Sequence, residues 1–416
     1  MGFFRTRKDI FIQEGVSMEY QGIIITGTSG AGKSSIAQKL CEQYKIFQIV
    51  QAVTTRKPRE DDYHRQYQYI SKVEFEKLDE DNRLLIKSEY RGKYYGITHE
   101  ALQEVIGNSK IPLLILTPKS VVELKIKKNL EDYTSFIVFL DAPDEILDTR
   151  LNSRGENINE TVIQQRKEDR GYLERLLKIY PTDYVYSIKN TDIEKTLKLI
   201  WSLWNHRKTG GILSEKLIRL MIECDMLLEN ANLDNIQGAS YDLRLGDKYF
   251  QKGEIKTLDE QNPFVVMEPG DYVLISSKEI ANLPKDIAGR FDLTVSLFCK
   301  GVILSNGPQV DPGFHGRLFC LLFNTANNKV QLKHGEHYAT IEFVKLVEPT
   351  VPYMGKYQNK LKMKDYLPEM VEASAINKLM EDVENLKKEK WWIKILPLVV
   401  SILALILAIA ALIGMR

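Results

Sequence analysis

A glycine-rich segment at residues 27–34, GTSGAGKS, constrains the fold of this chain more than any other feature. It matches the pattern G-x-x-x-x-G-K-[ST], follows an apolar run at residues 22–26, and precedes a helical pattern at residues 34–44. A strand, such a loop and a helix in this order predict a P-loop, whose backbone N–H groups and helix N-terminus bind phosphate oxygens. The segment therefore predicts an α/β domain with a nucleotide site.

The P-loop also indicates the cofactors, which we expect to be ATP and Mg²⁺. The ammonium of Lys33 supplies positive charge to the β and γ phosphates, and the hydroxyl of Ser34 is a ligand for Mg²⁺. The predicted ATP-binding residues are Gly27, Thr28, Ser29, Gly30, Ala31, Gly32, Lys33, Ser34 and Ser35.

Up to about residue 204 the hydrophobic pattern continues in the same style. Apolar runs at residues 111–116 and 135–140 read as buried strands, and helical patterns follow at residues 143–153 and 160–178. Strands that alternate with helices predict a mostly parallel sheet covered by helices on both faces.

The hydrophobic pattern is different in the second half of the chain. One helical pattern at residues 214–227 is followed, over residues 241–347, by short strand-like runs such as DYVLIS, RLFCLLF and ATIEFV. Turn signals such as EPGD, DPGFHG and KHGE separate these runs. Many short strands with close turns predict an all-β sandwich or barrel.

The run at residues 395–414, ILPLVVSILALILAIAALIG, is 20 residues long and uncharged. A helix of this length spans a bilayer, and the alternative, a buried core helix that is apolar all round, would need a large core to surround it. Basic residues and two tryptophans precede the run, so the positive-inside rule places the body of the chain in the cytoplasm. We expect a single-pass, tail-anchored membrane protein. The preceding flank comprises Lys387, Lys388, Lys390, Trp391, Trp392 and Lys394.

Charge and cysteine content bear on which partners to expect. The formal net charge is +1 and no block of like charge stands out, so we expect no nucleic acid partner. The four cysteines are scattered without C-x-x-C spacing, which argues against a zinc site or a disulfide framework and fits a reducing cytosol.

Four further motifs of the first domain resemble those of guanylate kinases, over about residues 20–204. The family's T-T-R-x-P-R segment is similar to residues 54–59, its D-Y-x-F-V-S element to residues 66–71, and its G-N-Y-Y-G to residues 92–96. Its lid motif, R-L-x-x-R-G, is similar to residues 150–155. The resemblance implies an ATP-dependent kinase in which arginines neutralise the transferring phosphoryl group. It implies catalytic roles for Lys33, Arg150, Arg154 and Arg166, and acceptor-phosphate binding by Arg56, Arg59, Tyr67 and Tyr95.

The positions that read the guanine base in that family are different here. Ala52 replaces a serine, Ile86 replaces a glutamate, and Ile97 replaces a serine or threonine, while TPKS at residues 117–120 replaces D-V-Q-G. An apolar pocket does not pair with the N1 and N2 donors of guanine. We therefore expect an acceptor other than GMP. It is another nucleoside monophosphate or a phosphorylated sugar, since ribose 1,5-bisphosphate phosphokinases look like guanylate kinases without the guanine reader.

Residues from about 213 to 360 resemble dCTP deaminases and dUTPases, which are trimeric β folds. GASYDLRLG at residues 238–246 is similar to the S-x-D-L-R-L-G element, and QVDPGFHG at residues 309–316 to the I-D-P-G-[WF]-x-G hairpin. Residues 333–343 resemble the following turn and strand, and residues 356–359 the K-Y-x-x-Q lid. The resemblance implies a homotrimer with a second nucleotide site at Ser240, Asp242, Arg244, Asp311, Phe314 and Lys356.

Catalytic positions of this second family are altered. The general acid–base glutamate, ten residues after the hairpin aspartate, is Leu321 here, and a leucine cannot transfer protons. The R-S-S-L phosphate element is RFDL at residues 290–293, where Asp292 would repel a triphosphate. Three hypotheses stay open: an active kinase, a deoxynucleotide sensor in which the second domain only binds, and a dCTP or dUTP hydrolase that depends on Asp311.

The predicted organisation combines these parts into one chain. It comprises a leader at residues 1–18, a guanylate kinase-like P-loop domain at 19–206, a linker at 207–212, a deaminase-like β domain at 213–360, a helical stalk at 361–390 and a transmembrane tail anchor at 391–416.

Overall fold

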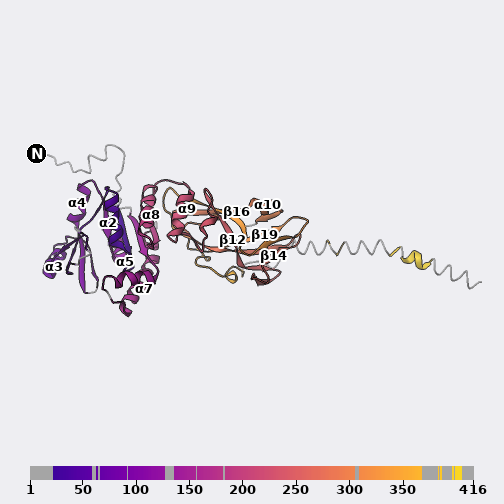
Figure 1. The fold of residues 1–416 in the computed structure, drawn as a ribbon, viewed down its shortest axis with the longest axis horizontal. Helices are drawn as coiled ribbons and strands as arrows, with labels where there is room; N and C mark the ends of the chain where they lie inside the picture. Colours follow the sequence, from indigo (N-terminus) through magenta and orange to yellow (C-terminus); the bar gives the residue numbers. More distant parts are fainter. Residues whose placement is uncertain are drawn as a thin grey trace, which may run out of the picture.

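The computed structural model describes most of the chain up to residue 367 (Figure 1). The described residues are 22–58, 62–63, 66–90, 92–126, 135–155, 157–180, 183–304 and 309–367, together with 383, 385–386, 396–397 and 399–404. The predicted leader and most of the predicted stalk and membrane helix lie outside them. No helix among the described residues is long and apolar enough to cross a membrane. The tail anchor therefore stays a prediction.

The first domain is built on a five-stranded parallel sheet, as predicted. The strand order is β2-β7-β1-β8-β9, and every neighbouring pair is parallel. The central strand β1 is buried along its whole length because it has neighbours on both sides and helices on both faces. The strands are β1 (Gly22–Gly27), β2 (Phe47–Ile49), β7 (Ile111–Ile115), β8 (Ser135–Asp141) and β9 (Tyr184–Lys189).

Alternate side chains of β1 enter two separate cores. Ile23 and Ile25 pack in the core that includes α2 (Lys33–Gln43) and α8 (Ile193–Asn205). Ile24 packs on the opposite face, in the core that includes α4, α5 and α7. The remaining helices of this domain are α3 (Lys72–Glu80), α4 (His99–Gly107), α5 (Pro118–Ile126), α6 (Asp144–Asn152) and α7 (Glu160–Ile179).

A second sheet of the first domain carries the segment predicted to bind the acceptor. Its strand order is β4-β3-β6-β5. Helix α3 follows β4 in the chain and begins with a capping box, in which the side chains of Ser71 and Glu74 each accept a hydrogen bond from the other residue's backbone N–H. The strands are β3 (Ala52–Thr54), β4 (Tyr67–Tyr69), β5 (Leu84–Tyr90) and β6 (Lys93–Thr98).

The second domain is rich in β structure, as predicted. Its main sheet has the path β17-β19-β15-β12-β21-β16-β18, and β14 (Phe264–Met267) pairs with β20 (Val330–Lys333) in a small separate sheet. The main path comprises β12 (Ser240–Gln251), β15 (Tyr272–Asn282), β16 (Ile287–Leu293), β17 (Val302–Leu304), β18 (Gln309–Val310), β19 (His315–Asn324) and β21 (His337–Lys345). Three strands pair beside it: β10 (Gly211–Ile212), β11 (Leu227–Glu229) and β13 (Glu254–Thr257).

Two short helices accompany this sheet, α9 (Glu215–Glu223) and α10 (Val295–Cys299). The helix expected over residues 214–227 ends four residues early, at Glu223. Its ending has a backbone cause, because Asp225 and Leu227 adopt positive φ angles of 63° and 69°, which no α-helix contains.

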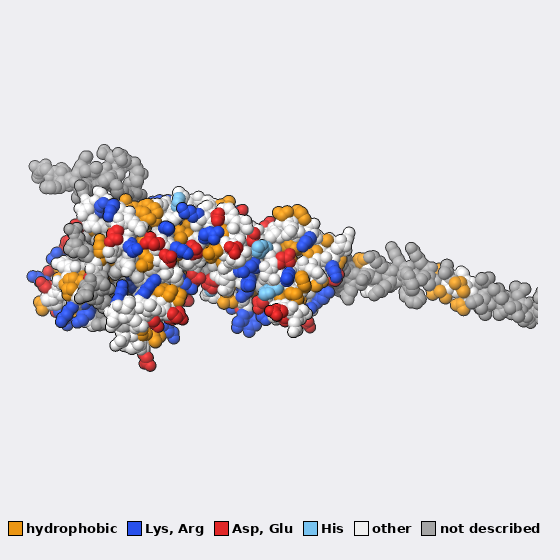
Figure 2. Space-filling model, viewed as in Figure 1, with side chains coloured by type: hydrophobic (Ala, Val, Ile, Leu, Met, Phe, Trp, Pro, Cys, Tyr) orange, Lys and Arg blue, Asp and Glu red, His pale blue; other side chains and the backbone are white. Residues whose placement is uncertain are grey.

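The two domains pack against each other through α8, α9 and the edge strand β9 (Figure 1). One of the two cores of the first domain continues into the second domain, and Trp204 of the first and Ile218 of the second both belong to it. Acidic and basic side chains are intermixed on the visible face of both domains (Figure 2). The described residues between 22 and 367 thus form one packed body, in which the two domains share a buried interface.

Candidate functional site

The P-loop connects β1 to α2 with the geometry that its glycines require. Gly32 is the N-cap of α2 with a φ of 87°, and a Cβ there would lie 2.8 Å from Nδ2 of Asn190. Gly27 has no room either, since its Cβ would lie 1.9 Å from the carbonyl oxygen of Leu140. No side chain caps α2, so its first N–H groups stay available for an anion.

Lys33 lies folded over this loop. Its Nζ donates to the carbonyl oxygens of Gly27 at 2.9 Å and Thr28 at 2.8 Å. Burial lowers the pKa of Lys33 to about 8, and the nearby carboxylate of Asp169 opposes that shift. Lys33 is therefore still mainly a cation at neutral pH, and a phosphate group would strengthen its charge.

Two of the predicted lid arginines have buried N–H groups that lack a partner among the described residues. Nη2 of Arg150 donates to the Asn190 carbonyl at 2.8 Å, whereas Nη1 has no partner and lies 4.0 Å from the Cβ position of Gly32. Arg166 is 3% exposed, and its Nε and Nη2 are unpartnered. Buried donors of this kind are costly unless an acceptor reaches them, so the site fits the phosphates of ATP. Arg154 lies near enough to lower the pKa of Lys33.

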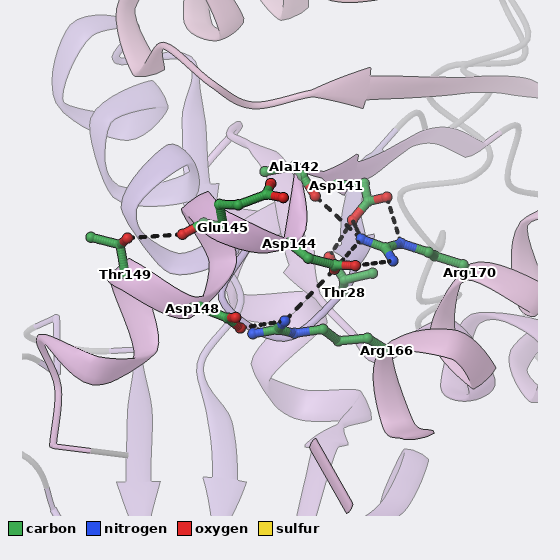
Figure 3. Close-up of polar contacts among 9 residues, drawn as sticks. All are labelled: Thr28, Asp141, Ala142, Asp144, Glu145, Asp148, Thr149, Arg166 and Arg170. Atoms are coloured by element: carbon green, nitrogen blue, oxygen red, sulfur yellow. Dashed lines mark hydrogen bonds and ion pairs between the residues drawn. The ribbon is translucent and has the colours of Figure 1, made fainter. Parts of the chain in front are cut away.

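Three aspartates hold Arg166 and a second arginine of α7, Arg170, in place (Figure 3). Arg166 pairs with Asp148 at 2.6 Å, and Arg170 bonds both Asp141, at 2.9 Å, and Asp144, at 2.8 Å. Asp141 ends β8 beside the P-loop and accepts a hydrogen bond from Oγ1 of Thr28 at 2.8 Å. Our sequence reasoning missed these carboxylates and Arg170. The available signal was an aspartate placed directly after the buried strand at residues 135–140.

Two amide side chains complete the site and were also missed. Gln66 is 3% exposed, and its Nε2 donates to Oγ of Ser34, the predicted Mg²⁺ ligand, at 2.9 Å. Asn190 is fully buried, and its Nδ2 donates to the Ala31 carbonyl at 2.8 Å. Both residues hold the P-loop from segments that are distant in the sequence.

The acceptor-phosphate residues come together on the second sheet. The guanidinium of Arg56 lies 4.6 Å from the ring centre of Tyr67, and the rings of Tyr67 and Tyr95 lie 6.2 Å apart. Asp62 fills the fork of Arg56 with two hydrogen bonds and accepts a third from Tyr69. An acceptor phosphate would therefore have to displace the carboxylate of Asp62 in order to bind Arg56. Arg59, the fourth predicted residue, lies outside the described part of the chain.

The positions that would read guanine are apolar or already paired. Ile86 and Ile97 are cross-strand partners, 7% and 2% exposed, within the same buried core. The hydroxyls of Thr117 and Ser120 bond each other at 2.7 Å. The two isoleucines offer no hydrogen-bonding group to the edge of a purine, and the two hydroxyls are engaged with each other.

The predicted second nucleotide site is divided between distant strands of one sheet. On β12, Asp242 accepts from Thr340 at 2.8 Å and Arg244 donates to the buried Glu279 at 2.6 Å. Ser240 begins the same strand. Asp311 follows β18, and the path of the sheet places β21 and β16 between β12 and β18. Two strands therefore lie between Arg244 and Asp311 in the order of the sheet.

The hairpin after β18 is held by its own neighbours. Asp311 accepts from Nε2 of Gln309 at 2.8 Å, and the buried ring of Phe314 packs edge-on against Tyr353 at 5.5 Å. Lys356 lies 4.9 Å from the ring centre of Tyr357. Leu321, at the general acid–base position, lies on β19 opposite Leu274.

His315, next to Phe314, predicts a pH-dependent stability. Its Nε2 lies 3.1 Å from Oε1 of Glu229 and its Nδ1 2.7 Å from Oδ1 of Asn359. The hydrogen bond with Glu229 raises the pKa of His315 above 6.5, and the same bond lowers the pKa of Glu229 below 4.5. The histidine's contribution is complete below pH 6.5 and is lost as the pH rises through its folded pKa. The glutamate's contribution is present above pH 4.5 and is lost as the pH falls through its folded pKa.

We therefore expect the His315→Gln variant to lose most stability, relative to the unchanged chain, between pH 4.5 and 6.5, where both contributions are present, with the difference shrinking as the pH rises through the folded pKa of His315. Urea unfolding across this range measures it. A difference that does not vary with pH would show that the ion pair contributes nothing.

Comparisons with known proteins agree with the two-part architecture. Residues 19–206 match the family described as guanylate kinase, and residues 212–346 match the family described as dCTP deaminase-like. The dCTP deaminase of Pyrococcus horikoshii is 36% identical over 143 residues, which are 34% of this chain and 90% of that protein. The guanylate kinase of a Synechocystis species is 28% identical over 182 residues, 44% of this chain and 91% of that enzyme. A dUMP-forming dCTP deaminase of Persephonella marina is 28% identical over 166 residues, 36% of this chain and 92% of that enzyme.

Proposed function

Because the chain belongs to the dCTP deaminase-like family through residues 212–346 and carries a guanylate kinase domain at residues 19–206, we propose that it is an ATP-dependent kinase of a phosphorylated acceptor other than GMP. One observation supports this most. Among the described residues, Lys33, Arg150 and Arg166 hold cationic groups for phosphate, two of them with buried N–H groups that have no partner, whereas the positions that would read guanine are buried isoleucines or hydroxyls bonded to each other.

The chain's own residues divide the work of phosphoryl transfer. ATP supplies the phosphoryl group, and Mg²⁺ neutralises charge on its oxygens. Lys33 and the P-loop N–H groups hold the phosphates, and the free N–H groups of Arg150 and Arg166 stabilise charge on the transferred group. Gln66 holds the hydroxyl of Ser34, the residue that would bind Mg²⁺.

On the acceptor side, Arg56 and Tyr67 bind the phosphate once the acceptor displaces Asp62. The remainder of the acceptor is expected beside β5 and β6, where Ile86 and Ile97 pack in the core and offer no hydrogen bond to a base. A nucleoside monophosphate without guanine's donors, or a sugar phosphate, requires none there.

Calorimetry tests this assignment directly on the full chain. Mg²⁺–ATP is expected to bind, and GMP is expected to bind at least about 100-fold more weakly than the best of other nucleoside monophosphates and ribose phosphates. The Arg150→Ala variant, which removes a buried free donor, is expected to bind ATP about 10-fold or more weakly. GMP binding equal to that of the best acceptor would contradict the apolar-pocket assignment.

A second candidate function rests on Leu321. With no acid–base side chain at that position, the second domain would bind a deoxynucleotide without turning it over, and the chain would act as a sensor. Release of ammonia from dCTP, or of pyrophosphate from dUTP, would instead favour the hydrolase alternative that depends on Asp311.

Membrane attachment through residues 395–414 and trimerisation are parts of the same proposal. The full chain is expected to sediment with membranes and to resist extraction by alkaline carbonate, while a variant that lacks residues 391–416 is expected in the supernatant. A full chain that is soluble without detergent would contradict the anchor, and a monomeric mass in detergent would contradict the trimer.

A further inference from the structure

Asn190 connects the P-loop to several neighbouring elements through hydrogen bonds. It follows β9, is fully buried, and uses each of its polar groups. Its Nδ2 donates to the Ala31 carbonyl of the P-loop at 2.8 Å, and its Oδ1 accepts from Thr196 at 3.0 Å. Its backbone N–H donates to Asp141, and its carbonyl accepts from Arg150, both at 2.8 Å. A shift of Asn190 would therefore move the P-loop, the end of β8 and a lid arginine together.

The neighbouring residue, Lys189, is attached to the other domain. Its backbone N–H donates to the carbonyl oxygen of Cys224 at 3.1 Å, and its Nζ pairs with the carboxylate of Asp225. Lys189, at the end of β9, and Asn190, which follows it, thus contact different parts of the molecule. One contacts the ATP site, and the other contacts the segment that follows α9 and includes β11.

That segment, residues 224–230, has unusual backbone geometry. Asp225, Leu227 and Asn230 have φ angles of 63°, 69° and 58°. A leucine in the left-handed region is a conformational outlier that persists only where its surroundings enforce it, and such outliers gather at switch regions. Nδ2 of Asn282 holds the segment by donating to the Asp225 carbonyl at 2.9 Å.

A row of residues paired across neighbouring strands connects this segment to the second predicted nucleotide site. Leu227 pairs with Asn282 of β15, and Asn282 pairs with His315 of β19. His315 directly follows Phe314 of the predicted nucleotide hairpin and bonds Glu229 of the same segment. On the other side, Nη2 of Arg244 donates to the Asn230 carbonyl at 2.5 Å.

We propose that the strained segment 224–230 couples the two nucleotide sites, with Asn190 as the positioning residue at the ATP end. This inference rests on the proposed function, since it requires ATP to bind at the P-loop. Binding of ATP fixes Asn190 and Lys189 and so orders segment 224–230. By linkage, a deoxynucleotide on the second domain alters the affinity for ATP by the same factor.

Hydrogen–deuterium exchange of the full chain, with and without ATP and Mg²⁺, tests the coupling. The uncoupling variant is Asp225→Gly, which relieves a positive φ and removes the ion pair with Lys189. The matched control is Lys252→Gly in the β12–β13 turn, which also relieves a positive φ, of 52°, and removes an exposed ion pair, with Asp271 at 3.5 Å.

ATP is expected to slow exchange at least about threefold both at the P-loop and at residues 224–230, in the unchanged chain and in Lys252→Gly. In Asp225→Gly the slowing is expected at the P-loop only. Slowing confined to the P-loop in all three proteins, or equal slowing of segment 224–230 in all three, would overturn the coupling. No slowing at the P-loop would contradict ATP binding itself and so the proposed function.

Discussion

Replacing Lys33 with alanine is expected to lower kcat/KM for ATP-dependent phosphoryl transfer by about 10³-fold, which is about 4 kcal/mol of transition-state stabilisation. Nζ of Lys33 lies within 3 Å of two P-loop carbonyls, and its positive charge is the one fixed inside the loop. Alanine leaves the glycine geometry of the loop intact but removes this charge from the phosphates. Initial rates at several ATP concentrations separate a loss of kcat from a loss of binding.

Lys39→Ala serves as the control for this variant. Lys39 lies on the same helix, α2, and forms an exposed ion pair with Glu194 at 2.9 Å, so its loss is expected to change the rate less than twofold. If Lys33→Ala retained more than about a tenth of the transfer rate, the P-loop would not be the phosphate site.

Replacing Lys345 with methionine is expected to destabilise the whole chain up to residue 367 by about 3–5 kcal/mol. Nζ of Lys345 lies 2.5 Å from Oδ2 of Asp286, and their side chains are 3% and 2% exposed. Tyr186 of β9 donates to the same oxygen, which joins this buried ion pair to the first domain. Methionine preserves the packing volume but leaves the carboxylate of Asp286 buried without its cation.

Urea unfolding followed by tryptophan fluorescence measures this loss, because Trp201 and Trp204 report the first domain while the substitution lies in the second. The control is Lys195→Met, which removes an ion pair between the same domains but a half-exposed one, with Glu223 at 2.8 Å. Its expected effect is below about 1 kcal/mol. A first domain that keeps its stability in Lys345→Met would show that the two domains unfold independently.

Local sequence patterns were sufficient for the framework of the first domain. The apolar run before Gly27 and the helical pattern after Lys33 specify a buried strand and a helix, and the structure has them within a residue of the expected bounds. The predicted short strands of the second domain are also present, but β15, β19 and β21 each extend at least two residues beyond one end of the predicted run. In both cases hydrophobic period and turn residues act over a few neighbouring residues.

The partners of the site residues were not predictable in this way. Asp141, Asn190 and Gln66 each act on a residue brought close only by the tertiary fold, and an isolated aspartate or amide in a sequence looks like a surface residue. The early end of α9 was missed because helical periodicity continues past Glu223, and only packing against β15 and Lys189 explains the positive φ angles beyond it.

The docking of the two domains also left no signal in the sequence. Asp286 and Lys345 stand in strand-like runs where charged residues usually face water, and only the cover of β9 buries them. The polar residues near 207 were predicted only as a linker between the two domains. In the structure, both domains contribute to one core beside it.

The central claim, a kinase whose acceptor is not GMP, is tested most directly by transfer of labelled phosphate from ATP. The full chain, with Mg²⁺, is offered nucleoside monophosphates, deoxynucleoside monophosphates and ribose phosphates one at a time. Label is expected on one acceptor of this panel, with GMP used at least about 100-fold less efficiently. Efficient transfer to GMP, or transfer to none of the acceptors, would contradict the claim.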